Sequence, residues 1–228
     1  MSILNRKAIK ERMATTDYKN KLLVTPLLSE DQITPASVDI RLGSSIIIPK
    51  RTYVESHDVT DPNVVKQVER RRYDRVALKY HAKFILHPGE LILGVTFEYI
   101  SLPNNIFCSI ASRSSWGRLG LVVATASVIQ PGFKGCLTLE LANSSQSPIA
   151  LYPGLLIGQL VFDEMGSQED IAYEGRYRCP TEAGLPNFFS KDSDEEMTFW
   201  GLGRKQEPSG ASDPAGMDIA ASCTRPGV

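Results

Sequence analysis

Residues 83–103, KFILHPGELILGVTFEYISLP, show the pattern that indicates the fold class. Short apolar, β-branched runs are separated by Pro-Gly, Asn or Ser clusters. The same pattern continues in GLVVATASVI (residues 120–129), GCLTLELAN (residues 135–143) and SPIALYPGLLIGQLVF (residues 147–162). Many short strands separated by turn residues predict an all-β sandwich or barrel instead of alternating strands and helices.

Two of these stretches share a turn motif. LHPGELI (residues 86–92) and LYPGLLI (residues 151–157) both read L-[HY]-P-G-x-L-I. Proline fixes φ at the first central position of a turn, and glycine supplies a positive φ at the second, which is type II turn chemistry. Each motif is therefore predicted to open a strand.

The two ends of the chain differ from this middle part. NRKAIKERMATT (residues 5–16) predicts a short helix, because Ile9 and Met13 are four residues apart. After Phe162 the apolar pattern fades, and the last residues are rich in Gly, Ser, Pro and Ala. We expect a single domain over residues 1–203 and a disordered tail over residues 204–228.

Composition excludes several classes of function. The chain has 228 residues, 42% hydrophobic and 22% charged, and a net charge of -1, so no basic field indicates a nucleic-acid or membrane-surface partner. No apolar run approaches the ~18 residues that span a bilayer. The four cysteines form no CxxC pair and no signal peptide is evident, so we expect a cytoplasmic protein with reduced thiols.

Glu140 is the first residue that could carry chemistry. In CLTLELAN (residues 136–143), leucines alternate with Thr138, Glu140 and Ala142, which predicts a strand with one apolar face and Glu140 on the other. An isolated glutamate in such a strand usually faces solvent. If the second face lines a cleft, however, the carboxylate could act as a general base.

The segment SRSSWGRLG (residues 112–120) concentrates hydrogen-bond donors between two apolar runs. Arg113 and Arg118 offer forked guanidinium groups suited to phosphate oxygens, and Ser112, Ser114 and Ser115 add hydroxyls. A solvated loop is the alternative that composition alone leaves open. A P-loop is excluded, because G-x-x-x-x-G-K-[ST] does not occur in the sequence.

Zinc chemistry is not indicated. The three histidines and four cysteines form neither an H-x-E motif followed by P-C-x-x-C nor an HExxH motif. There is also no G-x-S-x-G nucleophile elbow.

Taken in order along the chain, the motifs are more specific than they are singly. TPASVDIRLGSSI, LHPGELILGVTFEYISLPNNI, RSSWGRLGL, QPGFKGCLTLELANSS and PIALYPGLLIGQLVF together resemble the dCTP deaminase family of the dUTPase-like superfamily. The resemblance covers roughly residues 1–180. It implies a mainly β fold, a distorted antiparallel β-barrel or jelly-roll of the dUTPase-like type with a short N-terminal helix, assembled as a homotrimer.

The resemblance also implies an activity. Members of this family deaminate dCTP to dUTP and ammonia without zinc, at sites between subunits. Mg²⁺ is bound with the nucleoside triphosphate, so protein side chains are expected to supply no metal ligands. Some members also release diphosphate, giving dUMP. Asp39 in SVDIRLG is expected to fix local structure.

Individual roles follow from the matching positions. Glu140 matches the general base that activates water, Arg118 and Ser114 match groups that support this step, and the carbonyl of Ala126 matches one that holds the water. Arg113, Ser114 and Ser115 match the triphosphate-binding segment. The segment of about residues 166–203 resembles a C-terminal lid over the nucleotide, with Tyr173, Arg176 and Tyr177 near the matching positions.

Two departures from the family pattern affect these expectations. Gln130 precedes Pro-Gly where the family has an aspartate beside the sugar, and glutamine cannot act as a base at neutral pH. We therefore expect weakened phosphohydrolysis and altered sugar recognition. The lid has no matching glutamine after YEGRYR. A nucleotide-binding sensor or regulatory trimer with little turnover, and a bifunctional deaminase–diphosphatase, remain alternatives to the dUTP-forming deaminase.

Overall fold

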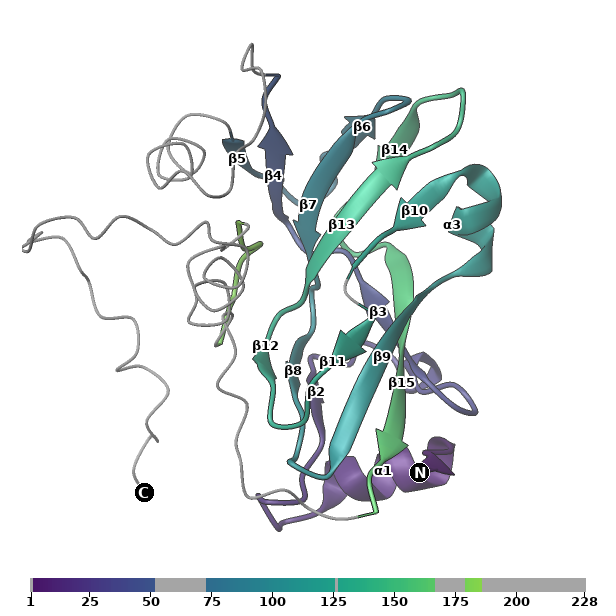
Figure 1. The fold of residues 1–228 in the computed structure, drawn as a ribbon, viewed down its shortest axis with the longest axis vertical. Coiled ribbons are helices and arrows are strands. Elements are labelled where there is room, and N and C mark those ends of the chain that lie inside the picture. Colours follow the sequence, from purple (N-terminus) through teal and green to yellow (C-terminus); the bar gives the residue numbers. More distant parts are fainter. Residues whose placement is uncertain (1, 52–72, 126, 167–178, 186–228) are drawn as a thin grey trace, which may run out of the picture.

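The computed structural model describes residues 2–51, 73–125, 127–166 and 179–185. These residues form a mainly β protein with few helical turns (Figure 1). The strands are β1 (Ser2–Ile3), β2 (Leu23–Thr25), β3 (Val38–Arg41), β4 (Ser45–Pro49), β5 (Tyr73–Ala77), β6 (Phe84–Leu86), β7 (Leu91–Val95), β8 (Tyr99–Ser101), β9 (Ile106–Ser112), β10 (Leu121–Val123), β11 (Val128–Ile129), β12 (Lys134–Gly135), β13 (Thr138–Asn143), β14 (Ile149–Leu151) and β15 (Leu156–Glu164). The helical elements are α1 (Arg6–Ala14), the 3₁₀ helix η1 (Glu30–Gln32) and α3 (Ser114–Leu119).

The described strands pair antiparallel in four sheets. One sheet has the order β1-β15-β9-β11, with β3 also paired to β15, and a second has the order β10-β13-β7-β4-β5. Two smaller sheets have the orders β12-β8-β2 and β14-β6. The predicted mainly antiparallel β fold is confirmed. Among the described strands, no pairing joins the first strand of a sheet to its last, so the sheets do not close into a barrel.

The two Pro-Gly motifs form the turns expected of them. Gly89 has φ 76° and the Glu90 N–H donates to the His87 carbonyl at 3.1 Å, directly before β7. Gly154 has φ 91° and the Leu155 N–H donates to the Tyr152 carbonyl at 3.3 Å, directly before β15. A positive φ costs glycine nothing, because it has no Cβ. Both motifs therefore open a strand, as predicted.

The N-terminal helix is shorter than the segment predicted for it. The Asn5 side chain accepts a hydrogen bond from the Ala8 N–H at 3.0 Å and caps α1. Ile9 is completely buried and packs in a cluster that includes Val38, Ile100 and Phe162. In Figure 1, α1 lies across the lower end of the sheet formed by β9 and β15. The helix thus covers the end of this sheet.

A second and a third apolar cluster lie along the sheet that contains β13. Leu42, Ile46, Leu86, Leu139 and Leu141 belong to the second cluster. The third cluster joins β4 and β7 to Cys136 and to Ala183, which is only 2% exposed. Residues near the described C-terminal end of the chain are therefore packed into the core.

Two further expectations can be compared with the described residues. Cys108 and Cys136 are free and buried, as expected, but Cys179 is disulfide-bonded, so the expectation of reduced thiols is wrong at that position. No helix in the described part of the chain is long and apolar enough to cross a membrane. Most of the expected lid and the whole expected tail lie outside the described residues.

Candidate active site

Glu140 lies in the middle of β13, between two partner strands. It pairs with Leu93 of β7, and its neighbour Leu141 pairs with Val123 of β10. Burial alternates along β13, with Leu139 and Leu141 fully buried and Glu140 less so. The alternation predicted from the sequence is therefore present, and it directs Glu140 away from the leucine face.

The face of β13 that carries Glu140 borders a cavity of about 430 Å³, which we call the Glu140 cavity. This volume is within the usual range for a small-molecule site. Thr125, Gln130 and Thr138 line it together with Glu140, and most of the remaining wall is apolar, including Leu91, Leu93, Val128, Ile129, Phe133 and Leu137. The cavity has the composition of a ligand site, with a few polar groups in an apolar wall.

The Glu140 carboxylate is incompletely satisfied. Its Oε2 atom is buried and has no hydrogen-bond partner among the described residues. Buried carboxylate oxygens in folded proteins almost always have a partner, which can be an ordered water or a ligand. The geometry therefore leaves one acceptor of Glu140 available inside the cavity.

Thr125 holds the main chain of Glu140 in place, a role that the sequence analysis did not identify. The Glu140 N–H donates to Thr125 Oγ1 at 3.2 Å, and the Ala124 N–H donates to the Glu140 carbonyl at 2.8 Å. These two bonds fasten the segment after β10 to β13. The sequence signal for this contact is weak, because Thr125 only begins the stretch TASVIQPG that leads to the Pro-Gly turn.

Gln130 lies at the same cavity as Glu140. It follows β11, and its carbonyl accepts a hydrogen bond from the Phe133 N–H at 3.2 Å across the turn in which Gly132 has φ 78°. The structure thus brings together two site residues that are ten positions apart in sequence. Ala126, which lies between Thr125 and β11, is outside the described residues.

The donor-rich segment around α3 lies elsewhere on the chain. Arg113, Ser114, Ser115 and Arg118 are not among the residues that line the Glu140 cavity. Arg113 Nη1 lies 3.6 Å from Asp39 Oδ2, and the Trp116 Nε1 donates to the Leu156 carbonyl at 2.7 Å. A short helix anchored by Trp116 therefore replaces the solvated loop that composition left open.

The structure thus divides the expected site residues into two groups within one chain. Glu140 and Gln130 meet at the Glu140 cavity, whereas the segment from Arg113 to Arg118 lies apart from it. Tyr173, Arg176 and Tyr177 lie outside the described residues, so their expected contact with the nucleotide stays a prediction.

The described side chains offer no ready-made cation site. Within the described ranges, no group of three or more His, Cys, Asp or Glu residues is arranged to hold a metal ion. A Mg²⁺ ion prefers oxygen ligands and usually keeps waters and substrate phosphates in its shell. The expectation that Mg²⁺ is bound with the nucleoside triphosphate therefore stays a prediction.

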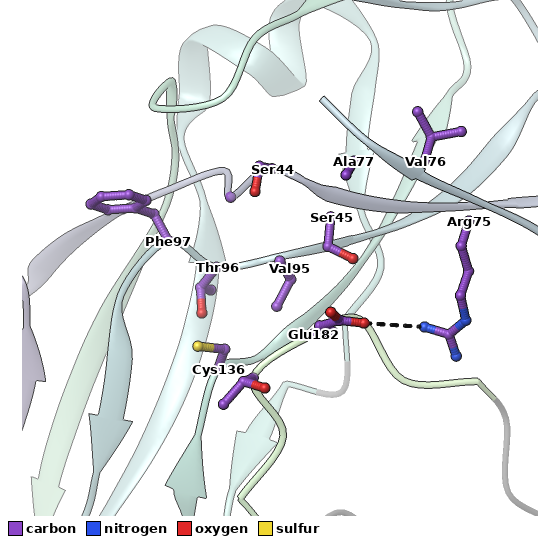
Figure 2. Close-up of a pocket in the computed structure, with 12 residues that line it drawn as sticks. Ser44, Ser45, Arg75, Val76, Ala77, Val95, Thr96, Phe97, Cys136 and Glu182 are labelled. Atoms are coloured by element: carbon purple, nitrogen blue, oxygen red, sulfur yellow. Dashed lines mark ion pairs between the residues drawn. The ribbon is translucent and has the colours of Figure 1, made fainter. Parts of the chain in front are cut away.

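Residues 179–185, which we call the wall segment, close one side of the Glu140 cavity. Pro180 and Gly184 line this cavity, whereas Thr181 and Glu182 line a second cavity of about 420 Å³. Arg75, Ser45 and Val95 border the second cavity, which we call the Arg75 cavity (Figure 2). Cys136 lines both cavities, so the wall segment and Cys136 separate them.

Comparisons with known proteins agree with this architecture. The sequence model of the dCTP deaminase-like family matches residues 3–165. A protein of Methanosphaera stadtmanae named dCTP deaminase, dUMP-forming, is 37% identical over 76% of this chain and 84% of its own length. A dCTP deaminase of Halorubrum lacusprofundi is 38% identical over 72% of this chain and 78% of its own length.

A solved structure shows the same fold. The crystal structure of 2′-deoxycytidine 5′-triphosphate deaminase from Agrobacterium tumefaciens matches with a TM-score of 0.54 and 26% identity. The match covers 70% of this chain and 47% of that chain. The fold therefore defines a class of mainly antiparallel β proteins that includes this deaminase. Within this class, the chain belongs to the dCTP deaminase-like family.

Proposed function

We propose that the protein hydrolytically deaminates dCTP, giving dUTP and ammonia. The observation that carries this proposal is the buried Oε2 of Glu140, which lacks a hydrogen-bond partner among the described residues and borders a cavity of ligand size. The names of its relatives, dCTP deaminase in H. lacusprofundi and dCTP deaminase, dUMP-forming in M. stadtmanae, support the choice of substrate.

The reaction uses Glu140 as a proton carrier. Glu140 takes a proton from a water molecule while the oxygen of that water adds to C4 of cytosine. The carboxyl group then gives the proton to the amino group, the C4–N bond breaks, and ammonia leaves. As the added hydroxyl becomes the C4 carbonyl, its proton passes through the same carboxylate to ring nitrogen N3. One carboxylate is therefore enough for both proton transfers.

The remaining proposed roles come from the family positions. We assign the carbonyl of Ala126 to holding the water and Ser114 and Arg118 to supporting the step at C4. Arg113, Ser114 and Ser115 bind the triphosphate, with Mg²⁺ held between its oxygens. Gln130 contacts the sugar, and Tyr173, Arg176 and Tyr177 cover the nucleotide. We assign the α3 segment to a neighbouring subunit of a homotrimer, and its absence from the described lining of the Glu140 cavity in its own chain supports this assignment.

A bifunctional enzyme that forms dUMP is the second candidate. The name of the M. stadtmanae relative, dCTP deaminase, dUMP-forming, favours it. Against it, Gln130 places an amide where hydrolysis of the phosphate chain would use a carboxylate, and an amide cannot accept a proton at neutral pH. We therefore expect dUTP to accumulate and little diphosphate to form.

Ammonia release and the nucleotide product, measured with dCTP and Mg²⁺, test the proposal. Glu140→Gln should lower kcat about 10²- to 10⁴-fold while dCTP binding persists, because the amide keeps the shape of the side chain but cannot carry the proton. Glu11→Gln, on the exposed face of α1, is the matched control and should leave kcat unchanged. Wild-type protein that binds dCTP but forms neither dUTP nor dUMP would refute the proposal and favour a nucleotide sensor.

A further inference from the structure

The wall segment is seated on the strands beside Glu140 by main-chain contacts. The Cys136 N–H donates to the Pro180 carbonyl at 2.6 Å, and the Gly184 N–H donates to Thr138 Oγ1 at 2.9 Å. Thr138 is two residues from Glu140 on the same face of β13. Any shift of the wall segment therefore changes the width of the Glu140 cavity next to its carboxylate.

Close packing limits where this segment can lie. A Cβ built on Gly135 would come within 2.4 Å of Pro180 Cδ, so the backbone at Gly135 and the proline ring are in direct contact. Ala183 is 2% exposed and packs with Leu93 and Val95 in the third apolar cluster. These contacts define one seated position for the wall segment.

Arg75 holds the segment from the side opposite Glu140. Its Nη1 donates to the Ala183 carbonyl at 3.4 Å and lies 3.7 Å from Glu182 Oε2 (Figure 2). Arg75 is on the edge strand β5, and its side chain lies in the Arg75 cavity. It therefore contacts the wall segment without lining the Glu140 cavity.

We propose that Arg75 is a positioning residue for the reaction at Glu140, acting through the wall segment that separates the two cavities. Arg75 fastens Glu182 and the Ala183 carbonyl, and this keeps Pro180 and Gly184 against the nucleotide site. The inference rests on the proposed function for its effect on activity, but the seating of the wall segment is a separate structural property that can be measured without nucleotide.

The reactivity of Cys136 reports this seating directly. Cys136 is 8% exposed, its N–H is bonded to Pro180, and it belongs to the same apolar cluster as Ala183, so we expect its thiol to become more accessible when the wall segment moves. Burial also raises the pKa of the Cys136 thiol, which slows its reaction with alkylating reagents. Cys108 is completely buried among other strands and serves as an internal reference.

The experiment compares alkylation rates of the two thiols, resolved by peptide mass spectrometry, in the full-length protein without nucleotide. In Arg75→Ala, Cys136 should be alkylated about three- to tenfold faster, the range expected from losing one largely exposed ion pair and one hydrogen bond. Cys108 should not change. Arg75→Lys, which keeps the charge but not the fork, should lie between wild type and Arg75→Ala.

Two further variants serve as a negative and a positive control. Lys50→Ala removes an exposed ion pair with Asp74, at 2.6 Å, on the same pair of strands, and should leave Cys136 unchanged. Ala183→Glu places a charge in the third cluster and should unseat the segment more strongly than Arg75→Ala. With dCTP as the substrate, Arg75→Ala should raise KM about three- to tenfold, as for the alkylation rate, and should change kcat by a smaller factor.

Unchanged alkylation of Cys136 in Arg75→Ala, while Ala183→Glu alkylates faster than wild type, overturns the seating role of Arg75. Faster alkylation with unaltered KM for dCTP overturns the positioning role, because the wall would then move without affecting the nucleotide. If wild-type protein does not deaminate dCTP, the proposed function fails, and the dissociation constant for dCTP replaces KM in deciding whether Arg75 positions the site.

Discussion

Glu98 is a buried glutamate whose carboxylate is held by hydrogen bonds from Arg41 and Gln32. It is fully buried, and its carboxylate accepts hydrogen bonds from the Arg41 N–H at 2.8 Å and from Gln32 Nε2 at 3.1 Å. Gln32 also donates to the Asp39 carbonyl at 3.1 Å. This network holds β3 in place. The Asp39 side chain on β3 pairs with Arg113, which agrees with the structural role expected of Asp39.

The titration of Glu98 makes stability depend on pH. Burial raises the pKa of Glu98 above its ordinary value, and the Arg41 N–H bond and the Arg41 charge oppose this effect without cancelling it. The folded protein therefore binds the proton more tightly than the unfolded chain. The free energy of unfolding falls as pH rises from the unfolded pKa to the folded pKa, and this contribution is constant above it.

Glu98→Gln should remove this pH dependence, because an amide does not ionise. We expect the stability of wild type relative to Glu98→Gln to be greatest at about pH 4 and to decline as pH rises through the window above the ordinary carboxyl pKa. Denaturant unfolding of both proteins across this range measures the difference. A difference that grows with pH would show that the carboxylate is stabilised on folding.

At the scale of elements, the end of α3 depends on close backbone packing. Gly120 follows α3 with φ 93°, and its carbonyl accepts hydrogen bonds from the Ser144 N–H and Oγ, both at 2.9 Å. A Cβ at this position would lie 2.6 Å from the Ser145 Cβ. The turn after β13 is thus held directly against the helix that carries Ser114 and Arg118.

Gly120→Ala should therefore destabilise the protein by about 1–3 kcal/mol, through the positive φ and the steric overlap together. Thermal or denaturant unfolding measures this cost. Gly117→Ala is the matched control inside α3, because no atom lies within 4 Å of its added Cβ and alanine favours a helix. Equal stability of the two variants would mean that the Ser145 turn moves aside without cost.

At the scale of the whole molecule, the separation of the two groups of site residues has a measurable consequence. Glu140 lines a cavity that the α3 segment of the same chain does not reach. If a homotrimer combines the two groups, two variants that are each inactive can restore each other's activity. Residues supplied by different copies of the chain can meet in a mixed assembly.

Mixing Glu140→Gln with Arg118→Ala, after dissociation and reassembly, should recover activity at about one quarter of the sites, since each site draws at random on two subunits. Ammonia release from dCTP measures the recovery, and sedimentation of each protein measures the assembly. Reassembled mixtures that stay inactive, while wild type treated in the same way is active, would place both residues in one subunit.

The strand pattern and the local chemistry of the turns could be predicted from the sequence. Alternating leucines around Glu140, and proline followed by glycine at the openings of β7 and β15, are local features that depend on side-chain period and allowed φ. The order of motifs along the chain also indicated the family. Because these motifs are local, Glu140, Gln130 and the donors around α3 could be named as candidate site residues from the sequence.

Which of these residues share a cavity depends on the tertiary fold. Thr125 and the wall segment contact Glu140 or its cavity, and Arg75 contacts the wall segment, through strand pairing and packing that no local pattern encodes. The same applies to the open sheets, since closure into a barrel depends on which edge strands pair. Long-range contacts form when apolar surface from distant segments is buried. The arrangement of the site therefore follows from the folded structure and not from any local sequence pattern.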